Sequence, residues 1–460
     1  MANYLFKKIV SICCFLIVLS LAMPGQAKVS KEEADQLKTT LTSLGAERQG
    51  NADGTIPPWD GGIKTIPPIG YNGPGSLYPD PYENDEVVLR ITKDNLNQYS
   101  DKLSEGIKEL FKRFPDTYYI DVYPTRRSMA APEWMYENTH KNALTAEADE
   151  NTMIITGAYG GVPFPIPKNG FEIVMNHLLR WLGHGIHYEH RGLIIDSSGR
   201  ISPGEGGPVW FKLPYYDKNG TLENSNGYYM YMFSLMTAPP RKNGEVILAL
   251  DPVNMAKSER KAWQYLTGQR RVRRAPSISY DTPNTTFGGH INYDDQYMFN
   301  GSPDRYNWKI IDKKEMYIPY NCYKVYLEPD LKKRFIANHP NPEYVRWELH
   351  RVWVVEGTLK EGSRHVYNKR RFIIDEDSWN IVLSDNYDAQ GELWRSLVFH
   401  SKVSYDLPGI SLGEVIGFEF QRGVYIVQTQ TSQFGKDLNH EIIEDDSFFT
   451  PENIRRRGLR

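Results

Sequence analysis

The chain contains almost no cysteine. Only three of its 460 residues are Cys, and two of them, Cys13 and Cys14, lie within an apolar run near the N-terminus. If that segment is cleaved, Cys322 is the single remaining thiol, which excludes an internal disulfide. The fold must therefore be stabilised by its hydrophobic core, and a mature chain of about 430 residues is long enough to bury a large one.

Long hydrophobic runs are scarce as well. The one clear run covers residues 9–23 and has 15 residues, fewer than the ~20 that span a bilayer. Lys7 and Lys8 precede it, and small residues follow it directly before Lys28, an arrangement typical of a secretory signal peptide. We predict that residues 1–27 are a cleaved signal peptide and that the protein is exported; an uncleaved membrane anchor is the alternative.

Positive charge is not in excess. The formal net charge is −3, and removing the two lysines of residues 1–27 makes it −5. This balance argues against nucleic acid or an anionic membrane surface as the main partner. The sequence also lacks the HExxH, P-loop and dinucleotide-binding motifs. We therefore expect no cofactor, and no motif indicates an enzyme.

Helical patterns are concentrated in the first 180 residues. Ser30 and Glu33 are spaced as a capping box, and apolar residues at helical spacing continue from there to Leu44. Two further amphipathic helices are predicted over residues 94–114 and 170–181. These few helices are too short to form the whole fold.

An arm separates the first of these helices from the remainder of the chain. Residues 50–81 are rich in Gly and Pro, which form neither helix nor central strand readily. We therefore expect two parts in the mature chain: an N-terminal helix and extended arm, residues 28–84, and a domain of residues 85–460.

Short strand patterns follow one another from about Gly185 onwards, with turn residues between them. Strands joined by hairpins form an antiparallel sheet, and a sheet of ten or more strands must curl or close. We predict an α+β fold with a large, strongly curved antiparallel half-barrel whose concave side is covered by a few helices. The expected strands include 227–238, 245–250, 261–266, 343–359, 367–375, 379–384, 393–404, 414–421 and 424–431.

Several long motifs carry a resemblance to a known family. They occupy residues 44–62, 268–276, 300–305, 314–317, 348–355, 375–379 and 387–395. In these motifs the chain resembles the exported Gram-negative proteins grouped as a domain of unknown function with an outer-membrane lipoprotein-sorting-like fold. The resemblance covers essentially the whole mature chain.

The resemblance has implications for fold, location and partners. It implies a half-barrel similar to that of the periplasmic lipoprotein carriers, with helices that plug an apolar concavity, and a periplasmic location. It also implies a large efflux-type transporter and an outer-membrane protein as partners. It implies no reaction and no catalytic residues.

Four histidines lie within 14 residues, namely His177, His184, His187 and His190. Their spacing could bring ligands for a metal together on a helix. Glycines interrupt that helix, however, and on a strand His184 and His187 would point to opposite faces. We favour a structural role and assign no metal, although the sequence leaves metal binding open.

Two charged motifs remain. Arg270, Arg271, Arg273 and Arg274 form the strongest basic patch, which is either a solvated hairpin or a site for an acidic partner or an anionic head group. Residues 375–377, Asp-Glu-Asp, could be paired carboxylates for acid–base chemistry. Because they lie between two apolar strands, we interpret them as a hairpin turn.

Aromatic residues make up 13% of the chain, and many lie on predicted strands. They either fill the core or line a lipid-sized cavity on the concave face. We predict a non-enzymatic periplasmic carrier for a hydrophobic or amphipathic, lipid-like molecule. The alternatives are an envelope enzyme that acts on lipid or glycan and a glycan-binding module. The candidate cavity residues are Trp263, Tyr265, Trp347, Trp353, Trp379 and Trp394.

Overall fold

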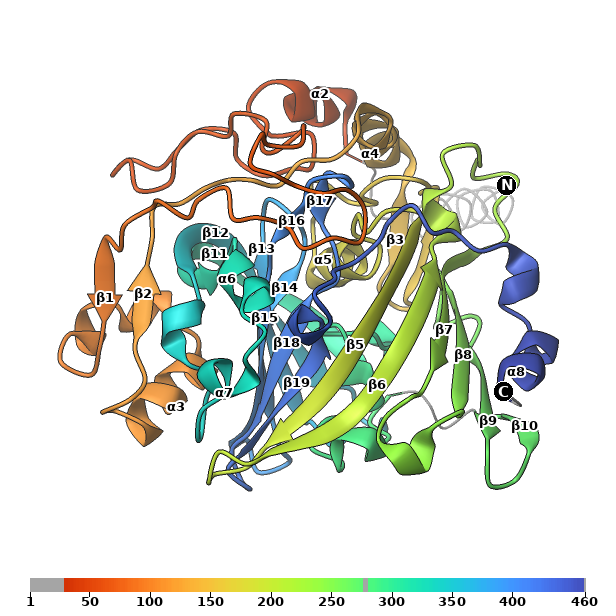
Figure 1. Cartoon of the computed structure of the whole chain (residues 1–460). Helices are drawn as coiled ribbons and strands as arrows, with labels where there is room; N and C mark the ends of the chain where they lie inside the picture. The colour runs from red at the N-terminus through yellow and green to blue at the C-terminus, as the bar shows by residue number, and fades with distance from the viewer. Residues whose placement is uncertain (1–28, 276–279, 459–460) are drawn as a thin grey trace, which may run out of the picture.

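One sheet of 15 strands dominates the computed structural model, which describes residues 29–275 and 280–458 (Figure 1). The predicted signal peptide, residues 1–27, lies outside the described residues. In spatial order the sheet contains β1 (Leu89–Ile91), β2 (Ile120–Val122), β12 (Trp347–Leu359), β13 (Lys369–Asp375), β14 (Ile381–Tyr387), β15 (Leu393–His400), β18 (Glu414–Glu419), β19 (Val424–Gln430), β5 (Gly185–Ile195), β6 (Ile201–Lys212), β7 (Tyr228–Leu235), β8 (Val246–Pro252), β9 (Lys261–Leu266) and β10 (Arg271–Arg274). β11 (Tyr306–Pro319) also pairs with β12.

The sheet consists of two meanders that lie side by side. β5 to β10 are successive antiparallel neighbours, and β11 to β15 with β18 and β19 form the second meander, whose last strand pairs with β5. The pairing of β2 with β12 is parallel. The order runs from β1 to β10 without joining these two strands, and the sheet curves strongly (Figure 1). The predicted antiparallel half-barrel is confirmed. Two small hairpins, β3 (Glu147–Asp149) with β4 (Ile154–Thr156) and β16 (Val403–Ser404) with β17 (Gly409–Ile410), stand apart from it.

Short helices surround the sheet. α3 packs against β14 and β15, α5 packs against β11 and β12, and α8 packs against β8, β9 and β10. No helix of residues 29–275 or 280–458 is long and apolar enough to cross a membrane. The helices are α2 (Lys31–Asp35), α3 (Glu105–Arg113), α4 (Glu133–Thr145), α5 (Gly170–Leu178), α6 (Tyr323–Leu327), α7 (Leu331–Arg334) and α8 (Pro451–Gly458). The sequence patterns did not predict α4 or α8.

The helix predicted over residues 94–114 forms only in its second half. Residues 96–102 make two 3-10 turns, and α3 begins after Ser104, whose side chain accepts a hydrogen bond from the Ile107 backbone. The Asn95 side chain bonds the backbone of Thr92 and Arg90. Such local bonds compete with the helix, which explains why apolar spacing alone misplaced its start.

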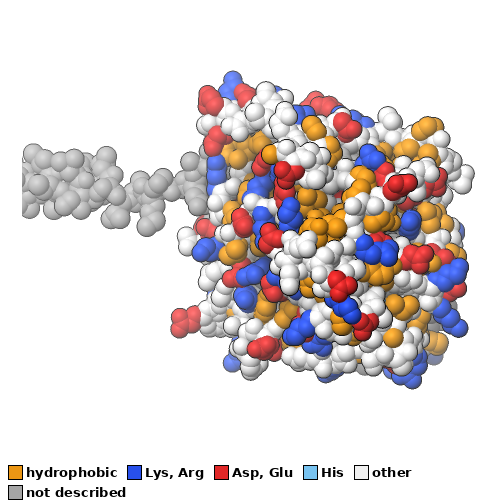
Figure 2. All heavy atoms as spheres, turned by 90° about the vertical axis from the view of Figure 1, so that its left-hand side faces the viewer, with side chains coloured by type: hydrophobic (Ala, Val, Ile, Leu, Met, Phe, Trp, Pro, Cys, Tyr) orange, Lys and Arg blue, Asp and Glu red, His pale blue; other side chains and the backbone are white. Residues whose placement is uncertain are grey.

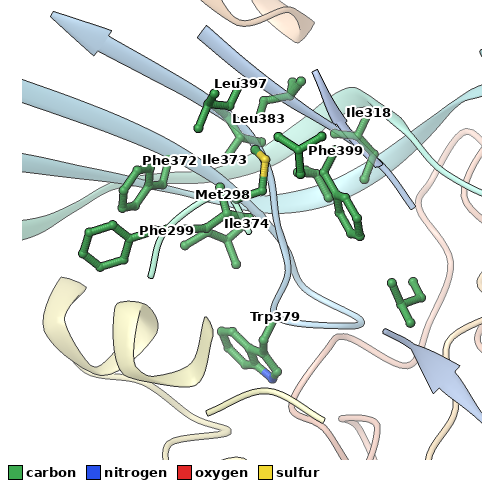
Figure 3. Close-up of a cluster of buried hydrophobic side chains, with 14 of the residues drawn as sticks. Met298, Phe299, Ile318, Phe372, Ile373, Ile374, Trp379, Leu383, Leu397 and Phe399 are labelled. Atoms are coloured by element: carbon green, nitrogen blue, oxygen red, sulfur yellow. The ribbon is translucent and has the colours of Figure 1, made fainter. Parts of the chain in front are cut away.

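An irregular segment fills the concave face. We call residues 280–305 the plug; it contains three 3-10 turns, at Thr285–Phe287, Tyr293–Asp295 and Pro303–Arg305. Within it, the Tyr297 ring contacts Phe211 of β6 at 5.7 Å, and the Phe299 ring contacts Phe372 of β13 at 5.3 Å. Since β6 and β13 are separated by five strands in the sheet, neighbouring plug residues can reach both only on the concave side. Figure 3 shows Phe299 and Met298 of the plug beside Phe372 and Ile374 of β13.

A glycine near the end of β12 permits close packing of this core. A Cβ added at Gly357 of β12 would lie 2.5 Å from the Trp308 ring. Trp308 cannot shift freely, because its Nε1 donates to the Pro303 carbonyl at 2.8 Å and its ring stacks on Phe372 at 5.4 Å. The close approach of β11 and β12 to the plug therefore requires glycine at this position.

We predict that Gly357→Ala lowers the free energy of unfolding by about 1–3 kcal/mol, the usual cost of overpacking a rigid core. Gly268→Ala is the matched control, because nothing lies within 4 Å of the added Cβ. Urea denaturation measures both. Equal midpoints for the two variants would contradict this account of the core.

Candidate functional site

Motifs that are distant in the sequence meet at one end of the sheet. The Trp379 Nε1 donates to the Leu44 carbonyl at 2.8 Å, and the Glu47 backbone N–H donates to Glu376 at 3.3 Å. Arg351 of β12 donates to the Gln49 carbonyl at 3.0 Å. We call this contact between the arm, β12 and the 375–380 turn the arm clasp. The turn connects β13 to β14, as predicted, but it is buried.

Arg127 is the centre of the arm clasp. Its guanidinium donates twice to Asp377, at 2.7 and 2.9 Å, and both side chains are at most 4% exposed. It also donates to the carbonyl of Glu47 at 2.7 Å and to that of Pro57 at 3.4 Å. A bidentate pair of this kind is strong and directional, so one buried residue fixes the arm on the turn.

A second group of charges lies directly beneath. Glu348 accepts from Arg346 at 2.6 Å and from His350 at 3.2 Å, and His350 also faces Asp375 at 3.4 Å. Burial by itself would lower the pKa of His350, but the hydrogen bonds to Asp375 and Glu348 raise it to about 9. Burial and the charge of Asp377 raise the pKa of Glu376 to about 7.

Three residues of this region have the composition of a metal site. Ligand atoms of His350, Asp375 and Asp377 lie within 4.8 Å of one another, and in the described part of the chain this is the one such group. Asp377 is already paired with Arg127, however, and a protonated His350 cannot donate a lone pair to a metal. The arrangement fits a structural clasp better than a metal centre.

Two pockets border the plug. The inner one lies between the plug and strands β5 to β8, and the outer one lies between the plug and the loop that joins β8 to β9. The inner pocket has a volume of about 30 Å³ and is bordered by residues that include His190, Met232, Met236, Tyr297, Asn300 and Thr429. The outer pocket has a volume of about 270 Å³ and is bordered by residues that include Met255, Glu259, Arg260, Tyr280, Ser302 and Arg305. Arg260 borders both pockets; it pairs with Asp251 and donates to the Asn300 carbonyl at 2.9 Å.

The backbone is strained around these pockets. Tyr280, Tyr297 and Met298 of the plug have positive φ values of 52°, 56° and 76°, and so does Thr429 of β19, at 57°. Bulky residues adopt this conformation at a cost of about 1–3 kcal/mol each, and such positions concentrate at functional sites. Holding the plug in this conformation therefore costs free energy, which the contacts around the plug must offset.

The six aromatic residues expected to line a cavity lie in different surroundings. Trp263 and Tyr265 pack with α8 in a separate cluster. Trp353 stacks on Trp379 at 6.5 Å beside the arm clasp. Trp347 borders a small groove, and Trp394 donates to Glu419 at 2.8 Å. Among the described residues they do not line one shared cavity, and none borders the two concave pockets.

The four clustered histidines also have separate neighbours. His177 of α5 accepts from the Ile381 backbone at 3.0 Å, and His187 bonds the Val209 carbonyl at 3.0 Å. His184 precedes β5 and is partly buried. His190 borders the inner pocket, where burial lowers its pKa to about 4. Its Nδ1 has no hydrogen-bond partner among the described residues.

Sequence reasoning missed the central residues of both regions. Arg127 and Arg260 belong to no recognisable motif. The motifs at 44–62, 348–355, 375–379 and 300–305 did contain the arm clasp and part of the plug. The four arginines of the basic patch lie at the end of the sheet, on β10 and the turn before it, and all are exposed.

Comparisons with known proteins agree with the resemblance seen in these motifs. Residues 90–455 match the family described as "Protein of unknown function (DUF1329)". The uncharacterised protein PA3922 of Pseudomonas aeruginosa is 39% identical over 453 residues, and 96% of each chain is covered. The expected family is confirmed.

Two solved structures are similar at lower scores. A DUF1329 family protein of Desulfovibrio piger is 15% identical with a TM-score of 0.40, and the match covers 59% of this chain and 92% of the other. A putative outer membrane lipoprotein-sorting protein domain of Vibrio parahaemolyticus is 15% identical with a TM-score of 0.43, and the match covers 62% and 98% of the two chains.

We predict that Asp377→Asn destabilises the protein by about 3 kcal/mol, because it removes the charge of the carboxylate that accepts two hydrogen bonds from the buried Arg127 and leaves only Glu376, at 3.7 Å, as an acidic partner. The arm should also be released, so that trypsin cleaves faster after Arg48. Asp53→Asn, an exposed change in the same arm, is the control. Urea denaturation and limited proteolysis measure the two effects, and an unchanged cleavage rate would show that Arg127 does not hold the arm.

Stability should also fall at alkaline pH. The pKa of His350 is raised from 6.5 to about 9 in the folded state, so its stabilisation is complete below about pH 6.5 and is lost as the pH rises through about 9. We expect the free energy of unfolding to decrease between pH 7 and pH 9 in the wild type and to decrease less in His350→Gln. His140→Gln, at a half-exposed histidine, should retain the wild-type slope. If the free energy of unfolding falls with pH at the same rate in all three proteins, His350 is not the cause of the decrease.

Proposed function

The chain belongs to the DUF1329 family, and for this member we propose a periplasmic binding protein that holds a hydrophobic or amphipathic, lipid-like molecule on the concave face of its sheet. The observation that carries the proposal is the plug. The concave face is covered by an irregular segment with strained backbone. One pocket remains between this segment and the sheet, and a second remains between the segment and the β8–β9 loop.

The composition of the pocket walls suits an amphipathic ligand. Met232, Met236 and Met255 provide adaptable apolar surface. Arg260 and Arg305 border the outer pocket and suit a polar or anionic head group. The unpartnered Nδ1 of His190 offers a further polar contact at the inner end. Both pockets thus combine methionine side chains with charged groups, which in the inner pocket include Glu205 and Asp251.

The present volume limits what can bind without movement. The outer pocket, at about 270 Å³, is slightly below the 300–1,000 Å³ of typical small-molecule sites. A long acyl chain would require the plug to move away from β5 to β8. Release of the positive-φ strain at Tyr297 and Met298 would offset part of the cost of that movement.

We also propose that the protein passes its ligand to other proteins of the cell envelope. The sequence motifs imply an efflux-type envelope transporter and an outer-membrane partner. A carrier with a displaceable plug would suit such a pathway, because the plug could return when the ligand leaves. Binding of the ligand is the step to test first.

We predict that the mature protein binds cis-parinaric acid, a fluorescent long-chain fatty acid, and that palmitate but not butyrate displaces it. Ser302→Trp should weaken binding at least about tenfold, since an indole would fill much of the outer pocket bordered by Ser302. Ser197→Trp, an exposed change in the turn after β5, is the matched control. Fluorescence titration gives the affinities.

Native mass spectrometry of the purified protein gives a second measurement. A co-purified lipid in the wild type and in Ser197→Trp, but not in Ser302→Trp, is the expected result. Failure of the wild type both to retain a lipid and to bind the probe would overturn the carrier proposal.

A further inference from the structure

We propose that the β10 edge and helix α8 together form a docking surface for an anionic lipid bilayer. The sequence shows two arginine clusters far apart in the chain, Arg270 to Arg274 and Arg455 to Arg457. The fold places them beside each other, because α8 packs on β9 and β10 (Figure 1). This inference does not depend on the proposed ligand.

Apolar contacts hold the two clusters together. Val272 of β10 packs against the cluster that contains Tyr265, Phe448 and Ile454. Gly458 at the end of α8 is so close to Tyr265 that an added Cβ would lie 2.4 Å from its ring. The arginines on both elements are therefore carried on one firm support rather than on independent loops.

The arginines project from this support without acidic partners. Arg270, Arg271, Arg273, Arg274, Arg455 and Arg456 are exposed, and Arg457 is partly exposed over the Phe448 ring at 4.5 Å. Across residues 29–275 and 280–458 none of the seven forms an ion pair with a carboxylate. Of the nearby acids, Asp446 is paired with Lys212 at 2.6 Å, whereas Asp445 and Glu452 are exposed, and Glu452 lies one turn before Arg455 and Arg456 on α8.

Structural roles account for only part of this pattern. Charged residues on an edge strand prevent pairing with other chains, which could explain the arginines of β10. A cation in the last turn of a helix interacts favourably with its dipole, which could explain one arginine of α8. Neither role requires seven exposed arginines on two neighbouring elements and the turn before β10, in a chain whose net charge is −3.

The charge distribution on the far side of the molecule is different. Figure 2 shows the face on the side of β1 and α3, where Lys and Arg side chains are interspersed with Asp and Glu around hydrophobic atoms. The β10–α8 surface is thus a local concentration of positive charge. Several arginines on one surface attract anionic lipid head groups additively, although the negative net charge of the whole chain opposes approach at long range.

The position of the surface suits a protein that takes up lipid. Arg274 pairs with Trp263 in the β9–β10 ladder, three residues after Arg260 of the outer pocket. Docking through the arginines would therefore bring that end of the concave face close to the bilayer. Docking through the arginines does not itself require this proximity to the outer pocket.

Co-sedimentation with vesicles tests the proposal. The wild type should bind vesicles of equimolar phosphatidylglycerol and phosphatidylcholine but not vesicles of phosphatidylcholine alone. Binding should weaken as NaCl rises from about 0.1 M to about 1 M, because the Debye length falls from ~10 to ~3 Å. Failure of the wild type to bind anionic vesicles at the lower salt concentration would overturn the proposal.

Charge-neutralising variants locate the surface. The triple variant R271Q/R273Q/R274Q should lower partition into anionic vesicles on the order of 100-fold, and R455Q/R456Q should also lower it. The matched control R200Q/R364Q/R422Q removes three exposed arginines elsewhere and should partition almost as the wild type does. An equal loss in the control and the β10 variant would refute this location, as would binding to soluble heparin with no vesicle binding. Ligand titration of the same proteins keeps this test separate from that of the carrier proposal.

Discussion

The concave face of a wide, curved sheet must be filled, and the remainder of this structure depends on how that is done. Side chains of β5 to β9 cannot reach those of β12 to β15 across the concavity, so other segments must lie between them. The plug performs this role, with Phe299 against Phe372 on one side and Tyr297 against Phe211 on the other. Its irregular backbone adapts to both walls but includes strained positions. Because holding the plug in place costs free energy, a ligand needs less binding energy to displace it.

Buried charge provides much of the specificity of the fold. Among residues 29–275 and 280–458 there is one buried thiol, Cys322, and no disulfide. The arm is fixed instead through Arg127 and Asp377. A second buried arginine, Arg370, bridges Asp294 and Asp295 of the plug at 2.6 Å each and thus connects the plug to β13. Buried ion pairs add little net stability compared with apolar packing, but they penalise any arrangement that leaves one partner alone. Arm and plug are therefore held in one register by charges rather than by covalent links.

The surface shows why net charge is a poor guide to partners. The acidic balance of the chain argued against an anionic membrane, yet seven arginines from two distant segments meet on the β10–α8 surface. Electrostatic attraction at close range depends on the local arrangement, because salt screens charges beyond about 10 Å. Arg270 to Arg274 were visible in the sequence as a patch; the contribution of Arg455 to Arg457 required the packing of α8 on β9.

The sequence by itself determined the class of the sheet, the family and many of the strands, but the strands predicted from it did not include β5, β6 or β11. Local sequence patterns located β9 at residues 261–266 and β12 within 343–359, although in β12 both faces are buried between Trp347 and His350. Local patterns could not reveal the partner of Arg127, the strands joined by the plug, or the separation of Trp263 from Trp353. Those features depend on contacts between residues up to several hundred positions apart, which the curvature and strand order of the sheet decide. The tertiary structure alone therefore located the concave pockets, the arm clasp and the combined arginine surface.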